Sequence, residues 1–119
     1  MGFTMESYAE YEQLAETERK GAATRAELAA KVPYPMTPAG QADFIKEILD
    51  ILTRVPNGRG RGIFWWESAW VPVPGSGWAK QSGWEYVGEA GPGGNEWANQ
   101  ALFDYTGNAL PALAVIRDY

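Results

Sequence analysis

Two carboxylates follow segments that have the pattern of short β-strands. Glu6 comes directly after residues 1–5, where apolar and other residues alternate, and Glu67 closes the apolar run 63–67. In α/β folds the active site lies at the C-terminal ends of the strands. Two such carboxylates could hydrolyse a glycosidic bond, because this reaction needs a pair about 5–5.5 Å apart for retention or roughly 6.5–9.5 Å apart for inversion.

Both carboxylates also have a purely structural interpretation. Glu6 suits the first turn of a helix, where the helix dipole favours a negative charge. Glu67 suits a surface ion pair with Arg59 or Arg61. The chain has no Cys and no His, which excludes a thiolate nucleophile, a disulfide framework, an imidazole base and the common zinc sites. Any catalysis must therefore use carboxylates, hydroxyls, Lys, Arg or Tyr.

All six tryptophans lie between Trp65 and Trp97, in a region rich in glycine. Indole rings beside strand-end carboxylates suit a sugar site, because a ring lies against the C–H face of a sugar while polar groups bind its hydroxyls. The alternative is that the rings pack the loop against its own domain. Trp65 and Trp66 suit this alternative because they lie inside the predicted strand, whereas Trp78, Trp84 and Trp97 are harder to explain in this way.

The elements that must position these residues begin with a helix over residues 38–55. Thr37 is a suitable N-cap and Pro38 suits the first helical position. Apolar residues recur on one face with the helical period, namely Phe44, Ile45, Ile48, Leu49, Leu52 and Val55. After a turn, the run 63–67 is predicted to be a strand buried on both faces, as in a parallel sheet. Helix, turn and buried strand form the αβ half of a βαβ unit.

The rest of the chain holds one long connection and several short elements. Residues 68–96 form a loop of about thirty residues, and loops of this length are more often functional than accidental. A turn at 104–108 and a short helix at 109–116 follow. Capping-box spacings that start at Ser7 and Thr24 predict two further short helices near the N-terminus. The alternative is that residues 8–33 form one long irregular excursion.

Length and charge exclude several classes of protein. The chain has 119 residues, which suits one domain but is too short for a complete (β/α)₈ barrel. Its net charge of −5 repels phosphate groups, so nucleic acid and anionic membranes are not expected partners. The first residues lack the basic and apolar regions of a signal peptide, so none is expected in this chain, and no apolar run reaches the roughly 18 residues of a membrane span.

Longer motifs carry a family resemblance. They are Gly-Ile-Phe-Trp-Trp-Glu-Ser-Ala-Trp at 62–70, Asn-Gln-Ala-Leu-Phe-Asp at 99–104 and Gly-Asn-Ala-Leu-Pro at 107–111. Together they resemble the C-terminal part of glycoside hydrolase family 53, the arabinogalactan endo-β-1,4-galactanases, and residues 38–44 resemble the start of that family's seventh barrel helix. The resemblance implies an α/β fold: the C-terminal quarter of a (β/α)₈ TIM barrel, strands 7 and 8 with their loops and helices, incomplete as a barrel. Residues 1–119 would be the C-terminal part of a single barrel domain.

The resemblance also implies roles for individual residues. Residues 5–8, Met-Glu-Ser-Tyr, resemble the motif that ends the seventh strand, so Glu6 falls on the position of the catalytic nucleophile. Trp66 and Glu67 match substrate-binding positions at the end of the eighth strand. Strict strand alternation would put these two side chains on opposite faces.

Two departures from the family pattern bear on the chemistry. The family's acid/base Glu belongs to the fourth strand, which is absent here, and Asn95-Glu96 is not assigned that role. Some relatives have a calcium loop after the nucleophile motif, but residues 10–16 do not match its ligands. We therefore expect no metal ion and no cofactor.

The function implied is that of a retaining glycoside hydrolase that cleaves β-1,4-galactan or arabinogalactan by double displacement. The isolated fragment is expected to be inactive because it needs the rest of the barrel, and the full-length enzyme is expected to be extracellular. One alternative is a non-catalytic carbohydrate-binding module that uses the Trp-rich loop 65–97. A second alternative is a truncated gene product without activity.

Overall fold

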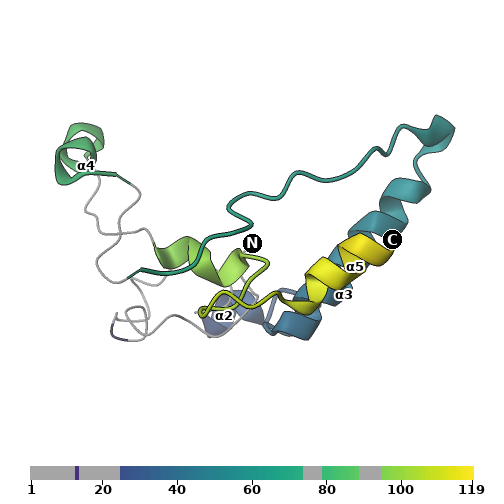
Figure 1. Ribbon diagram of the computed structural model, residues 1–119, viewed down its shortest axis with the longest axis horizontal. Coiled ribbons are helices and arrows are strands. Elements are labelled where there is room, and N and C mark those ends of the chain that lie inside the picture. Colours follow the sequence, from purple (N-terminus) through teal and green to yellow (C-terminus); the bar gives the residue numbers. More distant parts are fainter. Residues whose placement is uncertain (1–12, 14–24, 74–78, 89–94) are drawn as a thin grey trace.

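The regular elements in the described part of the chain are helices. The computed structural model describes Gln13 and residues 25–73, 79–88 and 95–119. The α-helices are α2 (Ala26–Ala29), α3 (Pro38–Thr53), α4 (Gln81–Val87) and α5 (Pro111–Asp118), and the 3₁₀ helices are η2 (Pro56–Gly58) and η3 (Asn95–Gln100). Figure 1 shows α3 and α5 together and α4 apart from them. The helix predicted from Ser7 lies outside the described residues.

Helix α3 is the longest element, and its sequence explains both of its ends. Thr37 has an extended backbone, and its side chain accepts a hydrogen bond from the backbone N–H of Gly40 at 3.1 Å. Pro38 occupies the first turn, where a missing N–H costs nothing. Beyond Thr53 the chain enters η2, where Asn57 and Gly58 have left-handed φ angles of 63° and 61°. The predicted helix is confirmed, with its end two residues earlier.

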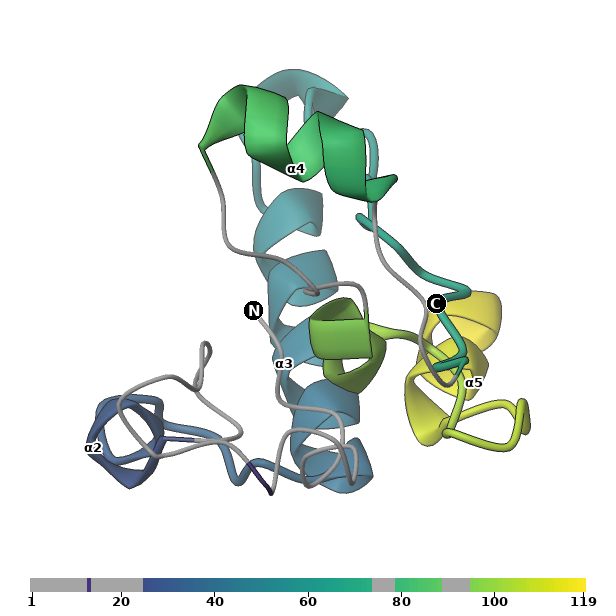
Figure 2. The same ribbon diagram turned by 90° about the vertical axis from the view of Figure 1, so that its left-hand side faces the viewer.

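The core lies between α3 and α5, which run side by side in both views (Figures 1 and 2). Ile45 of α3 and Ala112 of α5 are completely buried. Ala42 and Leu102 complete the buried cluster, and the partly buried Ile63 and Trp65 pack against it. Short alanine side chains on both helices allow a close approach, so a small set of apolar residues holds the pair together.

Two glycines allow the chain to pass close to α3. A Cβ atom at Gly40 would overlap the carbonyl oxygen of Pro35, and a Cβ atom at Gly60 would overlap that of Leu52. The segment that contains Gly60 passes the end of α3 and then leads back (Figure 1). Ile63 and Trp65 of this segment pack against the core, whereas Phe64 is exposed.

The loop before α5 is organised around Asp104. Its carboxylate accepts hydrogen bonds from the backbone N–H groups of Thr106 at 2.9 Å and Asn108 at 2.8 Å, and from both of their side chains. These bonds, foremost those from Asn108, lower the pKa of Asp104 to about 2. Gly107 supplies a φ of 90°, and Phe103 forms an antiparallel bridge with Ala109. The predicted turn is confirmed, and the final helix is confirmed with both of its ends two residues later than predicted.

The predicted strand at 63–67 is not found. Among the residues described, the only β-type pairing is the Phe103–Ala109 bridge, and residues 61–65 have no regular structure. Phe64 is fully exposed, so burial on both faces is also wrong. A parallel strand needs a neighbouring strand for its N–H and C=O groups, and none lies beside this segment in the described part of the chain. The barrel implied by the resemblance is therefore not visible there as a sheet.

Two further expectations meet the structure in part. The short helix predicted after Thr24 is present as α2, which ends well before Pro33. The long connection 68–96 is not irregular throughout, because α4 lies inside it and η3 begins within it.

Candidate functional site

The segment 63–66 is extended, and its side chains alternate between the core and solvent. Ile63 and Trp65 pack against the core cluster, whereas Phe64 is fully exposed and Trp66 is 71% exposed. At Glu67 the backbone changes to a left-handed conformation with a φ of 54°. Such an angle is uncommon for a residue with a side chain. It ends the extended segment and starts a turn that the N–H of Trp70 closes on the carbonyl oxygen of Glu67 at 3.3 Å.

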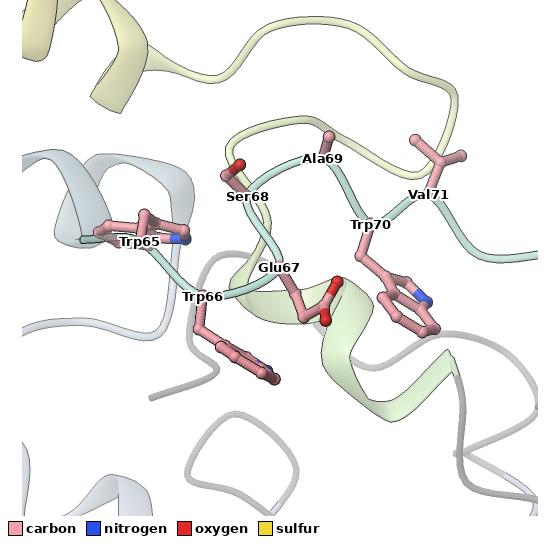
Figure 3. A pocket seen from close by; sticks show the side chains of 7 residues that line it. All are labelled: Trp65, Trp66, Glu67, Ser68, Ala69, Trp70 and Val71. Carbon is pink, nitrogen blue, oxygen red and sulfur yellow. The ribbon is translucent and has the colours of Figure 1, made fainter. Parts of the chain in front are cut away.

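This turn brings the side chains of Trp66, Glu67 and Trp70 to one side of the chain. In Figure 3 the carboxylate of Glu67 lies between the indole rings of Trp66 and Trp70, while Trp65 points elsewhere. The prediction that Trp66 and Glu67 lie on opposite faces is therefore wrong, because strand alternation ends where the left-handed residue begins.

The three side chains line an open depression of about 590 Å³. Its lining is the continuous segment Trp65, Trp66, Glu67, Ser68, Ala69, Trp70 and Val71. Two apolar ring faces with a hydrogen-bond acceptor between them can bind a sugar, since the rings cover its C–H face and the carboxylate accepts from its hydroxyls. The structure thus supports a binding surface here.

Residues 100–102 hold this segment in place. The indole N–H of Trp65 donates to the carbonyl oxygen of Gln100 at 2.9 Å, and the side-chain amide of Gln100 donates to the carbonyl oxygen of Trp66 at 3.3 Å. The N–H of Leu102 donates to the carbonyl oxygen of Ser68 at 2.7 Å. Backbone groups that a sheet would pair are here bound in part by a loop that precedes α5.

The structural interpretation of Glu67 finds no support in the described residues. Neither Arg59 nor Arg61 forms an ion pair with it there. The ion pairs among the described residues are Arg25–Glu27, Lys46–Asp50 and Arg117–Asp118.

Within the described residues no group of three or more Asp, Glu, His or Cys side chains could hold a metal ion. No described helix is long and apolar enough to cross a membrane.

The predicted site residues have different outcomes. Glu6 lies outside the described residues, so its role stays a prediction, and Trp78 lies outside them as well. Trp66 and Glu67 are brought together as neighbours on one surface. Trp65 follows the alternative interpretation, because it packs its loop onto the core.

Trp70 also lines the depression, although the sequence patterns did not predict it as a candidate. A signal was available in its spacing, because a turn brings residues i and i+3 close together, and Trp70 follows Glu67 at that interval. The turn was not predicted, because residues 63–67 were expected to form a regular strand that includes Glu67.

Comparisons with known proteins give the family. The profile of glycosyl hydrolase family 53 matches residues 4–116. The endo-beta-1,4-galactanase of Bacillus subtilis (strain 168) is 33% identical over 70 residues, which cover 46% of this chain and 16% of that protein. A Niallia circulans protein described as an uncharacterized protein in the bgaB 5' region is 44% identical over 39 residues, covering 33% of this chain and 11% of that protein.

The chain spans only a small part of these relatives, 16% and 11% of their lengths. No solved structure matches it significantly. The profile match, by contrast, runs over nearly the whole chain and includes the segment 65–71 that lines the depression. The chain therefore belongs to glycosyl hydrolase family 53.

Proposed function

We propose that this chain carries part of the active site of a retaining endo-β-1,4-galactanase, with Glu6 as the nucleophile. The observation that carries this function is the family match over residues 4–116, which includes Glu6, Trp66 and Glu67. Similarity to a protein named endo-beta-1,4-galactanase supports galactan as the substrate. We further propose that the full-length enzyme acts outside the cell, where this polymer lies.

The depression is proposed to bind the galactan chain beside the nucleophile. Trp66 and Trp70 would present ring faces to the sugar, and Glu67 would accept hydrogen bonds from its hydroxyls. The open shape of the depression and the 71% exposure of Trp66 support this assignment. A polymer substrate needs such an open surface, because its chain continues on both sides of the bond that is cleaved.

The reaction proceeds by two displacements. The carboxylate of Glu6 attacks the anomeric carbon, and the bond from that carbon to the leaving oxygen breaks as a second carboxylic acid protonates the oxygen. Water activated by that second carboxylate then attacks the anomeric carbon and releases Glu6, so the configuration is retained. The second carboxylate would come from the remaining part of a family 53 barrel, so this chain alone is expected to be inactive.

A chimera tests the role of Glu6. Residues 4–116 would replace the corresponding segment of the Bacillus subtilis galactanase, and the hydrolysis of β-1,4-galactan would be measured. We expect Glu6→Gln to lower kcat by at least about 10³-fold, because the covalent step is lost. The matched control is Glu85→Gln, which changes an exposed residue of α4 and should leave kcat unchanged. A Glu6→Gln chimera with normal kcat would disprove the assignment.

A carbohydrate-binding module is the second candidate, favoured by the fact that the depression is formed by one short segment of the chain. Such a module would bind β-1,4-galactan as the isolated 119-residue chain, with no loss on Glu6→Gln and a large loss on Trp66→Ala. The enzyme proposal predicts no measurable binding by the isolated chain. Affinity electrophoresis in galactan separates the two.

A further inference from the structure

The side chain of Gln41 contacts the backbone of Gln100, a residue far from it in the sequence. Gln41 lies in the first turn of α3 and is 1% exposed, and Gln100 ends η3 and is 6% exposed. The side-chain amide of Gln41 donates to the carbonyl oxygen of Gln100 at 3.4 Å and to that of Ala101 at 3.0 Å. The Oε1 atom of the same side chain is buried without a hydrogen-bond partner, so the two bonds donated by the NH₂ group are what fixes this amide.

The contact continues to the aromatic segment. The carbonyl oxygen of Gln100 also accepts the indole N–H of Trp65, which uses its second lone pair. The side-chain amide of Gln100 in turn donates to the carbonyl oxygen of Trp66, the residue before Glu67. A continuous path of hydrogen bonds therefore leads from α3 to Trp65 and Trp66, two of the residues that line the depression.

We propose that Gln41 is a positioning residue for the galactan-binding surface, acting through Gln100 on Trp65 and Trp66. The assignment of that surface rests on the proposed function, but the hydrogen-bond path does not. The lack of a neighbouring strand among the described residues explains why a side chain is needed to hold the segment 61–65. The segment 61–65 has no strand partner in the described part of the chain, so its fixed position depends on contacts such as these.

Replacement of the buried Gln41 by leucine removes its hydrogen bonds and keeps its bulk. Gln41→Leu keeps a side chain of similar size but removes both donors, which leaves the carbonyl oxygen of Ala101 without its 3.0 Å donor and weakens the hold on Gln100. A buried acceptor without its donor opens more easily. We expect the effect to reach Trp65 while the α3–α5 core, formed by other side chains, stays in place.

Hydrogen exchange of the full 119-residue chain tests this path without any sugar. The indole N–H of Trp65, identified by its absence in Trp65→Phe, should exchange about tenfold faster in Gln41→Leu. The backbone N–H groups of α3 that cover the core should change much less. The matched control is Gln81→Leu, which changes an exposed glutamine of α4 and should leave Trp65 unchanged. An unchanged exchange rate at Trp65, or an equal acceleration of the α3 groups, would overturn the proposal.

The opposite end of the path gives a second variant in case Gln41→Leu fails to fold. Trp65→Phe keeps an aromatic ring but removes the indole donor to Gln100. The side-chain NH₂ protons of Gln41 should then exchange faster, because the carbonyl oxygen that they share with Trp65 is held less firmly. If these protons exchange at the same rate, Gln41 does not act through Gln100.

Kinetics of the galactanase chimera separate the two proposals. Gln41→Leu should raise KM for galactan about tenfold with little change in kcat, because the surface it positions binds substrate and does not react. If the Glu6→Gln chimera keeps a normal kcat while Gln41→Leu still accelerates exchange of the Trp65 indole N–H, the proposed function alone is disproved. If Gln41→Leu leaves exchange of the Trp65 indole N–H unchanged while the Glu6→Gln chimera is inactive, the positioning role of Gln41 alone is disproved.

Discussion

The α3–α5 pair and the segment 61–73 contain similar apolar residues but bury them to different degrees. Ile45 and Ala112 are completely buried, whereas Phe64 is fully exposed and Val73 is 57% exposed. The pair is held by side-chain packing, and the segment is held in part by hydrogen bonds to residues 100–102. The difference separates the packed part of the molecule from the part that exposes the side chains proposed to bind galactan.

This separation follows a general principle of protein sites. Binding residues are often found on connecting segments that a rigid scaffold positions. Here the left-handed Glu67 directs two indole rings and a carboxylate to one side, and the buried Gln100 fixes the backbone beneath them. Changes in the scaffold should therefore alter stability, and changes in the exposed segment should alter binding.

The largest effect on stability is expected at Ile45. Ile45→Ala removes a completely buried side chain at the α3–α5 contact and leaves a cavity, which should lower the free energy of unfolding by about 2–4 kcal/mol. Urea unfolding followed by circular dichroism measures the loss. The contrasting variant is Phe64→Ser, which should change the same quantity by less than about 0.5 kcal/mol. Equal losses in both variants would remove the distinction between the two regions.

A smaller effect on stability is expected at Gly40, where the backbone of α3 lies close to the backbone of Pro35. Gly40→Ala would place a methyl group on the carbonyl oxygen of Pro35, which should destabilise the chain by about 1–3 kcal/mol. Gly83→Ala is the matched control, because its Cβ would meet the Cβ of Ala79 at an ordinary 3.4 Å. That change within α4 should stabilise the chain by about 0.5–1 kcal/mol. Thermal unfolding of both variants should therefore show a lower melting temperature for Gly40→Ala and a higher one for Gly83→Ala.

The smallest effect is expected at the exposed loop before α5, and it depends on pH. The pKa of Asp104 is about 2 in the folded chain, below its ordinary value of 3.8. A lowered folded-state pKa means that the carboxylate stabilises the fold above about pH 4. This contribution should decline as the pH falls toward 2 and be absent below it.

The variant Asp104→Asn isolates this contribution. The difference in melting temperature between the original chain and Asp104→Asn should shrink between about pH 4 and pH 2. Asp43→Asn, at an exposed position of α3 outside the loop, serves as the control for the other carboxyl groups. A difference that stays constant over this range would mean that the hydrogen bonds of Asp104 do not stabilise the loop.

Local signals were sufficient to predict the scaffold. The N-cap Thr37, the early Pro38 and the helical spacing of apolar residues all act within a few residues, and α3 forms where they predict. The turn around Asp104 is local in the same sense, since its bonds join residues only two and four positions apart.

The candidate site could be predicted only in part, because its geometry depends on contacts that are not local. The apolar run 63–67 suggested a strand, but a strand forms only beside another strand. Nothing in the residue type of Glu67 indicates a left-handed backbone, which decides where its side chain lies. The bonds from Gln41 to residues 100 and 101 span 59 and 60 positions, and no sequence period encodes such a pair.

The bond between Trp65 and Gln100 also has a consequence for the order of events on the ribosome. Its two partners are separated by 35 positions, so the aromatic segment leaves the ribosome well before the residue that anchors it. At a synthesis rate of about 5–20 residues per second, the wait is roughly 2–7 seconds. During that time Phe64 and the neighbouring indole rings have no anchor and are open to capture by a chaperone. Nascent chains arrested before and after residue 100 should therefore differ in chaperone binding.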